Sequence, residues 1–229
     1  MIGRALQLHF GLETADILKV VPLAAMHPLI PKIVVDDEGT FWKKPQALSK
    51  SKPKYKNKKV IFLVRDPRDV VVSSYFQKNR RWKQWYDSDL SSYIYEERGS
   101  YDTILRYYNI WAKNRHIPKD FMLVRYEDLH ASPHKELRRT LEFMGLSAIS
   151  DGVISEVVKY ASFDNMRKME EKNTFKGGML CLADRNDPES YKVRKGKVMG
   201  FAEYLNKDQI EYLNRKMTET LSDFYGYKP

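Results

Sequence analysis

The chain has 229 residues, a length that fits one domain, residues 1–229, with a full hydrophobic core. Hydrophobic residues make up 42% and charged residues 31%, which excludes collagen-like and wholly disordered proteins. Lysine and arginine number 40 against 30 aspartates and glutamates. The resulting net charge of +10 favours an anionic partner: a nucleic acid, a membrane surface, or a phosphorylated or sulfated small molecule.

Cys181 is the single cysteine, which excludes an intrachain disulfide and favours a reducing compartment, so we expect a cytoplasmic protein. No apolar run approaches the roughly 18 residues that a membrane span requires, and no span is expected. The five histidines are scattered along the chain without metal-ligand spacing. The sequence therefore predicts no metal site.

The predicted elements alternate between strands and helices. Residues 2–12 carry apolar residues at helical spacing, and three short apolar runs predict buried strands: Lys32–Val35, Val60–Val64 and Phe121–Arg125. Helix starts are predicted from capping residues and from proline at the first helical position: Asp66-Pro67, Ser100, Ser132-Pro133, and Asn206 with Gln209. This alternation predicts an α/β domain with a parallel sheet flanked by helices.

Eight lysines lie between Lys43 and Lys59, with no acidic residue among them. A solvated loop is the simpler interpretation of this segment, and a nucleic-acid surface is the alternative. The chain has no zinc-ligand spacing, basic heptad helix or RNA-recognition aromatic signature. We therefore expect no nucleic-acid partner.

The stretch from Val60 to Gln77 has the pattern of an anion site. Arg65 follows a buried strand directly, and a helix opens at Pro67, so the arginine and the free N–H groups of the helix lie at the ligand-binding edge of the sheet. Ser73, nearly two turns into the helix, can donate to the same phosphate. The alternative is that Arg65 pairs with a local carboxylate and Ser73 is a packing residue.

A second basic element is the segment Arg194-Lys195-Gly196-Lys197. Glycine permits close approach of the backbone to a ligand, and the cations neutralise an anion. Neither a Walker A motif nor a Gly-x-Gly-x-x-Gly motif is present, so a conventional triphosphatase or dinucleotide enzyme is not expected.

Three motifs, VRDPRDVVVSSYF, LVRYEDL and RKGKVMGF, in this order and spacing, resemble the bacterial-type sulfotransferases that use 3′-phosphoadenosine 5′-phosphosulfate (PAPS). The resemblance implies a fold like that of P-loop kinases and covers the chain from about Met1 onward. It also implies roles for single residues. Arg65 and Ser73 hold the 3′-phosphate, and Arg194, Lys195 and Gly196 close over it. Tyr126 contacts the adenine, and Phe163 stacks on it.

Two features of that family are not found in this sequence. Its first strand and phosphosulfate loop are expected immediately before Met1, so the domain is expected to be incomplete at its N-terminus. The family's general base is a histidine after the second strand, where this chain reads IVVDDEG. Asp36 or Asp37 takes that place, and Asp36 is the candidate catalytic residue. A carboxylate is a weaker base than imidazole near neutral pH.

The first hypothesis is therefore a PAPS-dependent transferase that moves a sulfuryl group to a hydroxyl or amine of a small-molecule or carbohydrate acceptor. The second is a nucleotide-binding remnant without transfer activity, and the third is a nucleic-acid-binding protein. An aromatic segment forms either an acceptor wall or ordinary core packing: Trp82, Trp85, Tyr86, Tyr93 and Tyr95. The acceptor itself and the oligomeric state stay open.

Overall fold

The computed structural model describes residues 1–14, 16–81, 85–175 and 180–229. Contacts divide the chain into two compact units, each built from two segments. Unit 1 comprises Met1–Val35 and Glu127–Gly196, and unit 2 comprises Asp36–Tyr126 and Lys197–Pro229. Each unit is described by itself below. A compact unit is not necessarily one that folds alone. The prediction that residues 1–229 form a single domain therefore stays a prediction.

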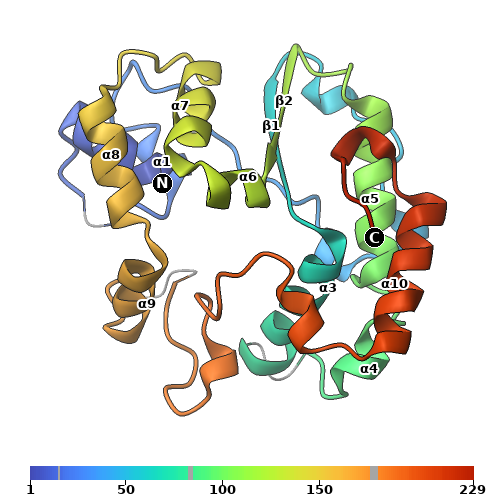
Figure 1. The fold of residues 1–229 in the computed structure, drawn as a ribbon. Helices are drawn as coiled ribbons and strands as arrows, with labels where there is room; N and C mark the ends of the chain where they lie inside the picture. Colours follow the sequence, from blue (N-terminus) through green and yellow to red (C-terminus); the bar gives the residue numbers. More distant parts are fainter. Residues whose placement is uncertain (15, 82–84, 176–179) are drawn as a thin grey trace. The chain divides into compact units, whose positions relative to one another are not determined.

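The sheet of unit 2 pairs β1 (Lys59–Val64) with β2 (Asp120–Arg125) in parallel, with Val64 opposite Arg125 (Figure 1). The predicted parallel sheet flanked by helices is thus confirmed, with two strands among the residues that the structure describes. The strand predicted at Lys32–Val35 was wrong. Val34 and Val35 are exposed, and no described strand lies beside this run. Without a neighbouring strand, the backbone N–H and carbonyl groups of the run have no partners with which to form a sheet.

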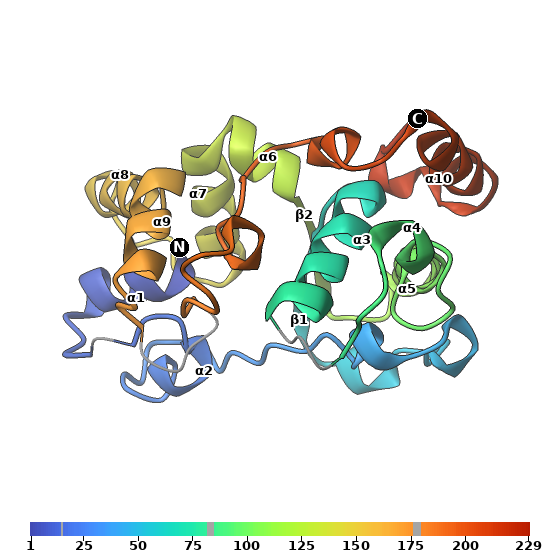
Figure 2. The same ribbon diagram turned by 90° about the horizontal axis from the view of Figure 1, so that it is seen from below.

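Helices connect and flank the two strands of unit 2. In both views α3 continues from the end of β1, and α5 lies alongside the sheet (Figure 1, Figure 2). The helices of this unit are α3 (Pro67–Phe76), the π-helical turn Gln77–Arg81, α4 (Leu90–Tyr93), α5 (Tyr101–Asn114) and α10 (Lys207–Thr220). Short 3₁₀ turns occupy Thr40–Trp42, Pro45–Ala47, Pro53–Tyr55, Gly200–Glu203 and Asp223–Tyr225.

The regular secondary structure among the described residues of unit 1 is all helical. It comprises α1 (Ile2–Phe10), α2 (Val20–Leu23), most of α6 (Tyr126–Ala131), α7 (Pro133–Phe143), α8 (Asp151–Tyr160), α9 (Phe163–Glu171) and a 3₁₀ turn at Pro188–Ser190. The apolar faces of α1, α7 and α8 form one buried cluster around Leu6, Leu141 and Ile154. A smaller cluster joins Phe175, Leu180 and Val193 to side chains of α9.

The capping signals located the helices well. The Asp66 carboxylate accepts from the N–H of Arg68 at 2.9 Å, and Asn206 and Gln209 form the predicted capping box of α10. The helices that follow Ser100 and Ser132 also start where predicted, but neither serine side chain caps its helix. The hydroxyl of Ser100 donates instead to the carbonyl of Tyr93.

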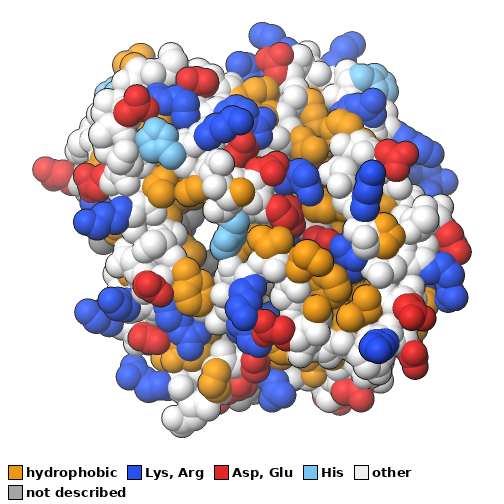
Figure 3. Space-filling model, in the orientation of Figure 1, with side chains coloured by type: hydrophobic (Ala, Val, Ile, Leu, Met, Phe, Trp, Pro, Cys, Tyr) orange, Lys and Arg blue, Asp and Glu red, His pale blue; other side chains and the backbone are white. Residues whose placement is uncertain are grey.

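Several lysines of the segment between Lys43 and Lys59 bind groups of the protein itself. Lys52 is 2% exposed and pairs with Glu38, and Lys54 pairs with Asp36. Lys44 pairs with Glu97, and Lys59 with Asp120. On the face drawn in Figure 3, lysine and arginine side chains alternate with aspartate and glutamate. Six of the eight lysines are exposed, as a solvated segment predicts, and Lys52 is the buried exception. None of the described helices is long and apolar enough to cross a membrane.

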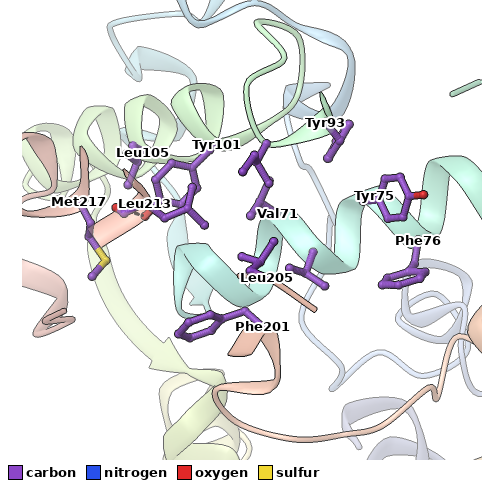
Figure 4. Close-up of a cluster of buried hydrophobic side chains, with 12 residues drawn as sticks. Val71, Tyr75, Phe76, Tyr93, Tyr101, Leu105, Phe201, Leu205, Leu213 and Met217 are labelled. Carbon is purple, nitrogen blue, oxygen red and sulfur yellow. Dashed lines mark hydrogen bonds between the residues drawn. The ribbon is translucent and has the colours of Figure 1, made fainter. Parts of the chain in front are cut away.

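The largest core of unit 2 surrounds α3. Figure 4 shows side chains of this helix with neighbours from α4, α5, α10 and residues 201–205. The ring of Tyr75 contacts that of Tyr93 on α4, and the ring of Phe76 contacts that of Tyr204. A second cluster, which includes Phe62, Tyr108 and Tyr225, covers the sheet. Because α3 is packed in this way, the start of the helix is fixed at the carboxyl end of β1.

Candidate functional site

Arg65 lies one residue beyond β1, immediately before the start of α3, as the sequence predicted. Its guanidinium lies over the ring of Tyr126, with Cζ 4.4 Å from the ring centroid. Tyr126 in turn follows β2 directly, so the two residues come from the same edge of the parallel pair. The structure thus brings together two of the residues predicted to bind a nucleotide.

The guanidinium of Arg65 also has acidic and carbonyl partners. Nη2 lies 3.0 Å from Oδ2 of Asp69, one turn along α3, and donates to the carbonyl of Lys197 at 2.7 Å. Nε donates to the same carboxylate at 3.3 Å. Among the described residues none accepts from Nη1. Arg65 therefore does pair with a local carboxylate, as the alternative interpretation predicted. The pair orients the guanidinium and leaves Nη1 without a described acceptor.

Asp69 is 3% exposed, and burial raises the pKa of its carboxyl while the adjacent Arg65 opposes that shift. Its two oxygens accept from the backbone N–H groups of Met199 and Phe201, each at 2.9 Å. Sequence analysis did not single out Asp69. Asp69 lies four residues after Arg65, at the start of a helix. This spacing is a sequence signal that can identify an arginine–aspartate pair.

Ser73 lies on the exposed side of α3, two turns from its start. The buried side of the same helix carries Val71 and Val72, so Ser73 is not a core packing residue. An exposed hydroxyl at this position is available to a ligand.

In unit 1, Phe163 is the first residue of α9, and Ser162 caps the helix by accepting from the N–H of Asn165. The ring of Phe163 is 38% exposed and lies against Gly196. A Cβ at Gly196 would lie 2.5 Å from Cδ2 of Phe163, and the glycine has a φ of 59°. Both facts require glycine here, because other residues carry a Cβ and rarely adopt this backbone conformation. The structure thus brings together two more predicted site residues.

Arg194 and Lys195 are partly buried beside this glycine. Nη1 of Arg194 lies 3.0 Å from Oε2 of Glu189. Upstream, Glu170 is fully buried and accepts from the N–H groups of Lys192 and Val193. No motif or local spacing points to Glu170, since its partners lie more than 20 residues away.

The candidate base Asp36 is committed to other groups. Its carboxylate accepts from Nζ of Lys54 at 2.7 Å, from the hydroxyl of Tyr55 at 3.0 Å and from the N–H of Glu38. The hydrogen bond from Lys54 lowers the pKa of Asp36 to about 2. These contacts weigh against a proton-accepting role, because a carboxylate of such low pKa is a poor base near neutral pH.

The aromatic segment proposed as an acceptor wall divides into two groups. Tyr93 is buried and Tyr86 packs against the core around α3, whereas Trp85 and Tyr95 are more than half exposed. Trp82 lies outside the described residues. Trp85 contacts Trp42, with ring centroids 4.8 Å apart. Of the four described aromatic residues of this segment, the exposed pair Trp85 and Tyr95 remains available for an acceptor.

A family model described as "Sulfotransferase domain" matches residues 43–225. The chain belongs to the sulfotransferase family. The match includes Arg65, Ser73, Tyr126 and the basic loop, so the resemblance inferred from the sequence motifs is confirmed.

Curated relatives agree with this sulfotransferase assignment. Cytosolic sulfotransferase 13 of Arabidopsis thaliana is 30% identical over 72% of this chain and 53% of its own length. Cytosolic sulfotransferase 10 of the same plant is 27% identical over 71% of this chain and 50% of its own length. The chain thus spans about half the length of the curated relatives it matches.

Among solved structures, mouse sulfotransferase SULT7A1 complexed with PAP superposes with a TM-score of 0.58 and 20% identity. The match covers 71% of this chain and 58% of the mouse chain. At this identity the likeness shows that the two chains share a fold.

Proposed function

We propose that this sulfotransferase-family chain transfers a sulfuryl group from PAPS to a hydroxyl or amine of a small-molecule or carbohydrate acceptor. The observation that carries the proposal is the placement of Arg65. It lies at the carboxyl end of β1 beside the start of α3, oriented by Asp69 and Tyr126, within the segment that matches the sulfotransferase domain. Such an edge is where open α/β sheets bind ligands.

The donor nucleotide is proposed to bind the residues that the sulfotransferase motifs assign to it. Arg65 and Ser73 bind the 3′-phosphate, and Tyr126 contacts the adenine. Phe163 stacks on the adenine, and Arg194, Lys195 and Gly196 cover the 3′-phosphate. The residues fit such a ligand: Nη1 of Arg65 has no described acceptor, and the half-exposed ring of Phe163 is backed by the glycine.

These residues bind and orient the donor. Sulfuryl transfer, like phosphoryl transfer, gains most from positioning and from cations that stabilise negative charge. Asp36 stays a candidate for the acceptor's base. Its contacts with Lys54 and Tyr55 favour the alternative that the chain binds the nucleotide without rapid transfer.

Calorimetry with adenosine 3′,5′-bisphosphate (PAP) tests the binding site. We expect PAP to bind more tightly than AMP or ATP, because the arginines and Ser73 are assigned to a 3′-phosphate. Arg65→Ala should lose about 2–5 kcal/mol of PAP binding, the range for truncating one partner of a buried charge pair. Arg106→Ala, an exposed arginine on α5, is the matched control. Equal binding of the three nucleotides, or unchanged PAP affinity in Arg65→Ala, would contradict the site.

Transfer itself is tested with ³⁵S-labelled PAPS and a panel of phenols, sterols, amines and sugars. Labelled product supports the enzymatic proposal. Tight PAP binding without labelled product across the panel would favour the nucleotide-binding alternative.

A further inference from the structure

We propose that two buried carboxylates are positioning residues, each within its own unit: Glu170 orders the backbone before the basic segment 194–198, and Asp69 orders the backbone after it. The inference rests on the proposed nucleotide-binding function, which assigns this segment to the 3′-phosphate. Each carboxylate accepts from two backbone N–H groups that flank the segment, and Asp69 also pairs with Arg65.

Glu170 holds the upstream end within unit 1. It is 0% exposed, Oε1 accepts from the N–H of Lys192 at 2.6 Å, and Oε2 accepts from the N–H of Val193 at 2.8 Å. One turn earlier on α9, Nη1 of Arg167 donates to the carbonyl of Val193 at 2.9 Å. The guanidinium of Arg167 also lies over the ring of Tyr191. Helix α9 therefore holds residues 192–193 in two ways: Glu170 accepts from their N–H groups, and Arg167 donates to the carbonyl of Val193.

Asp69 holds the downstream end within unit 2. Its Oδ2 accepts from the N–H of Met199 and its Oδ1 from the N–H of Phe201. Met199 has a positive φ of 59°, a conformation that a residue with a side chain adopts only where its surroundings impose it. The same carboxylate also pairs with Arg65, so one side chain orients an assigned phosphate ligand and the end of the loop.

Burying a carboxylate is unfavourable unless its oxygens are hydrogen-bonded, and an amide side chain of the same shape cannot accept at both positions. In Glu170 and in Asp69, each of the two carboxylate oxygens accepts from a different backbone N–H group. A carboxylate can accept at both oxygens, whereas an amide has only one oxygen to accept with. The backbone on each side of the basic segment is then ordered within its own unit before a ligand binds. Such preorganisation increases affinity without adding a contact.

Helix α9 links the anchor to the adenine-binding residue. Its first residue is Phe163, which lies against Gly196, and Glu170 lies two turns later. The ring of Phe163 and the upstream end of the basic segment are thus held by one rigid element.

The test compares the isosteric variants Glu170→Gln and Asp69→Asn with Glu142→Gln, at an exposed glutamate of α7. Calorimetry measures affinity for PAP and for AMP, which lacks the 3′-phosphate. We expect PAP affinity to fall about tenfold or more in the two buried variants, as loss of a charge-assisted hydrogen bond implies. AMP affinity and the Glu142→Gln control should change little. Glu170→Gln is the cleaner variant, because Asp69 also contacts Arg65.

A double-mutant cycle with Lys195→Ala separates positioning from general weakening. If Glu170 acts through the loop, Glu170→Gln should lower PAP affinity much less in the Lys195→Ala background than in the wild type. Equal losses for PAP and AMP, or additive losses in the cycle, would overturn the proposal. Absence of PAP binding by the wild-type chain would instead contradict the proposed function.

Hydrogen exchange of the wild-type chain provides a measurement that needs no variant. The amides of Lys192, Val193, Met199 and Phe201 should be protected before PAP is added, and PAP should add protection mainly to residues 194–198. If these four amides exchange as fast as the middle of the segment, the anchors do not hold it.

Discussion

The hydroxyl of Tyr108 donates to the carbonyl of Arg65 at 3.0 Å and accepts from the N–H of the same residue at 3.1 Å. Arg65 lies just past the last paired residue of β1, where the neighbouring strand no longer provides partners. Tyr108, on α5, takes the place of that strand for both backbone groups. The position of the arginine is therefore fixed through its backbone as well as its side chain.

Tyr108→Phe should destabilise unit 2 and weaken PAP binding together. The variant retains the ring but leaves two backbone groups of Arg65 without their partner, at a cost of about 1–3 kcal/mol. Urea denaturation measures the stability and calorimetry the affinity. Tyr95→Phe, at an exposed tyrosine, is the control. A variant as stable as the wild type would show that these hydrogen bonds are replaced by water.

Gly196→Ala should weaken PAP binding more than backbone strain alone explains. Gly11 has a similar φ, 62° against 59°, but a Cβ there meets nothing within 4 Å. The loss of unfolding free energy in Gly11→Ala therefore measures the cost of the left-handed conformation alone, about 1–2 kcal/mol. Gly196→Ala should lose more unfolding free energy, because its Cβ also collides with Phe163. The double variant Gly196→Ala/Phe163→Ala should recover part of that additional loss, and failure to recover any would argue against the contact.

Lys78 should make the stability of unit 2 depend on pH above neutrality. Its ammonium is 4% exposed, 4.5 Å from the ring centroid of Phe41 and 5.0 Å from that of Tyr93. Burial lowers the pKa of Lys78 to about 8, with Glu96 opposing the shift and Arg98 adding to it. Between about pH 8 and the ordinary lysine value of about 10.4, the unfolded chain binds more protons than the folded one. The penalty for burying this charge is therefore complete below pH 8 and is relieved as pH rises.

The measurement compares unfolding free energies of the wild type and Lys78→Met from pH 7 to 10.5. The wild type should gain stability relative to the variant across this range, whichever is more stable at pH 7. Lys113→Met, at an exposed lysine of α5, is the control for replacing a lysine by methionine. Parallel curves for the wild type and Lys78→Met would contradict the lowered pKa.

Asp36 should contribute to stability at neutral pH and lose that contribution in acid. Its hydrogen bond with Lys54 lowers its pKa to about 2, against an ordinary value of about 3.9. The contribution is complete above pH 4 and disappears as pH falls toward 2, since the folded state then takes up a proton that it disfavours. Asp36→Asn should reduce stability at pH 7 and approach the wild type near pH 2. Asp37→Asn, at the neighbouring aspartate, is the control.

The sequence predicted the elements whose signals are local. Asp66-Pro67 located α3, and the pair Asn206 and Gln209 located α10, because capping involves residues within one turn. The strand predicted at Lys32–Val35 failed for the opposite reason. A strand requires a partner supplied by another part of the chain, which apolar composition alone does not reveal.

The same distinction holds for the candidate site. Arg65 was predicted because it directly follows a recognisable strand, and Tyr126 because it lies in the LVRYEDL motif that resembles the family. Tyr108 and Glu170 were not, since each acts on backbone groups far along the chain, 43 residues away in the case of Tyr108. The residues that orient a site through long-range contacts are invisible to motif and periodicity.

The interleaving of the two units has a consequence for synthesis on the ribosome. Unit 1 has all its residues once Gly196 has been made, whereas unit 2 requires Tyr225, which is buried against the sheet and donates to the carbonyl of Tyr108. The strands of unit 2 are made before most of unit 1, yet their core is completed last. During translation the cluster around β1 therefore stays incomplete until Tyr225 is made, and in this interval the nascent chain is most exposed to aggregation.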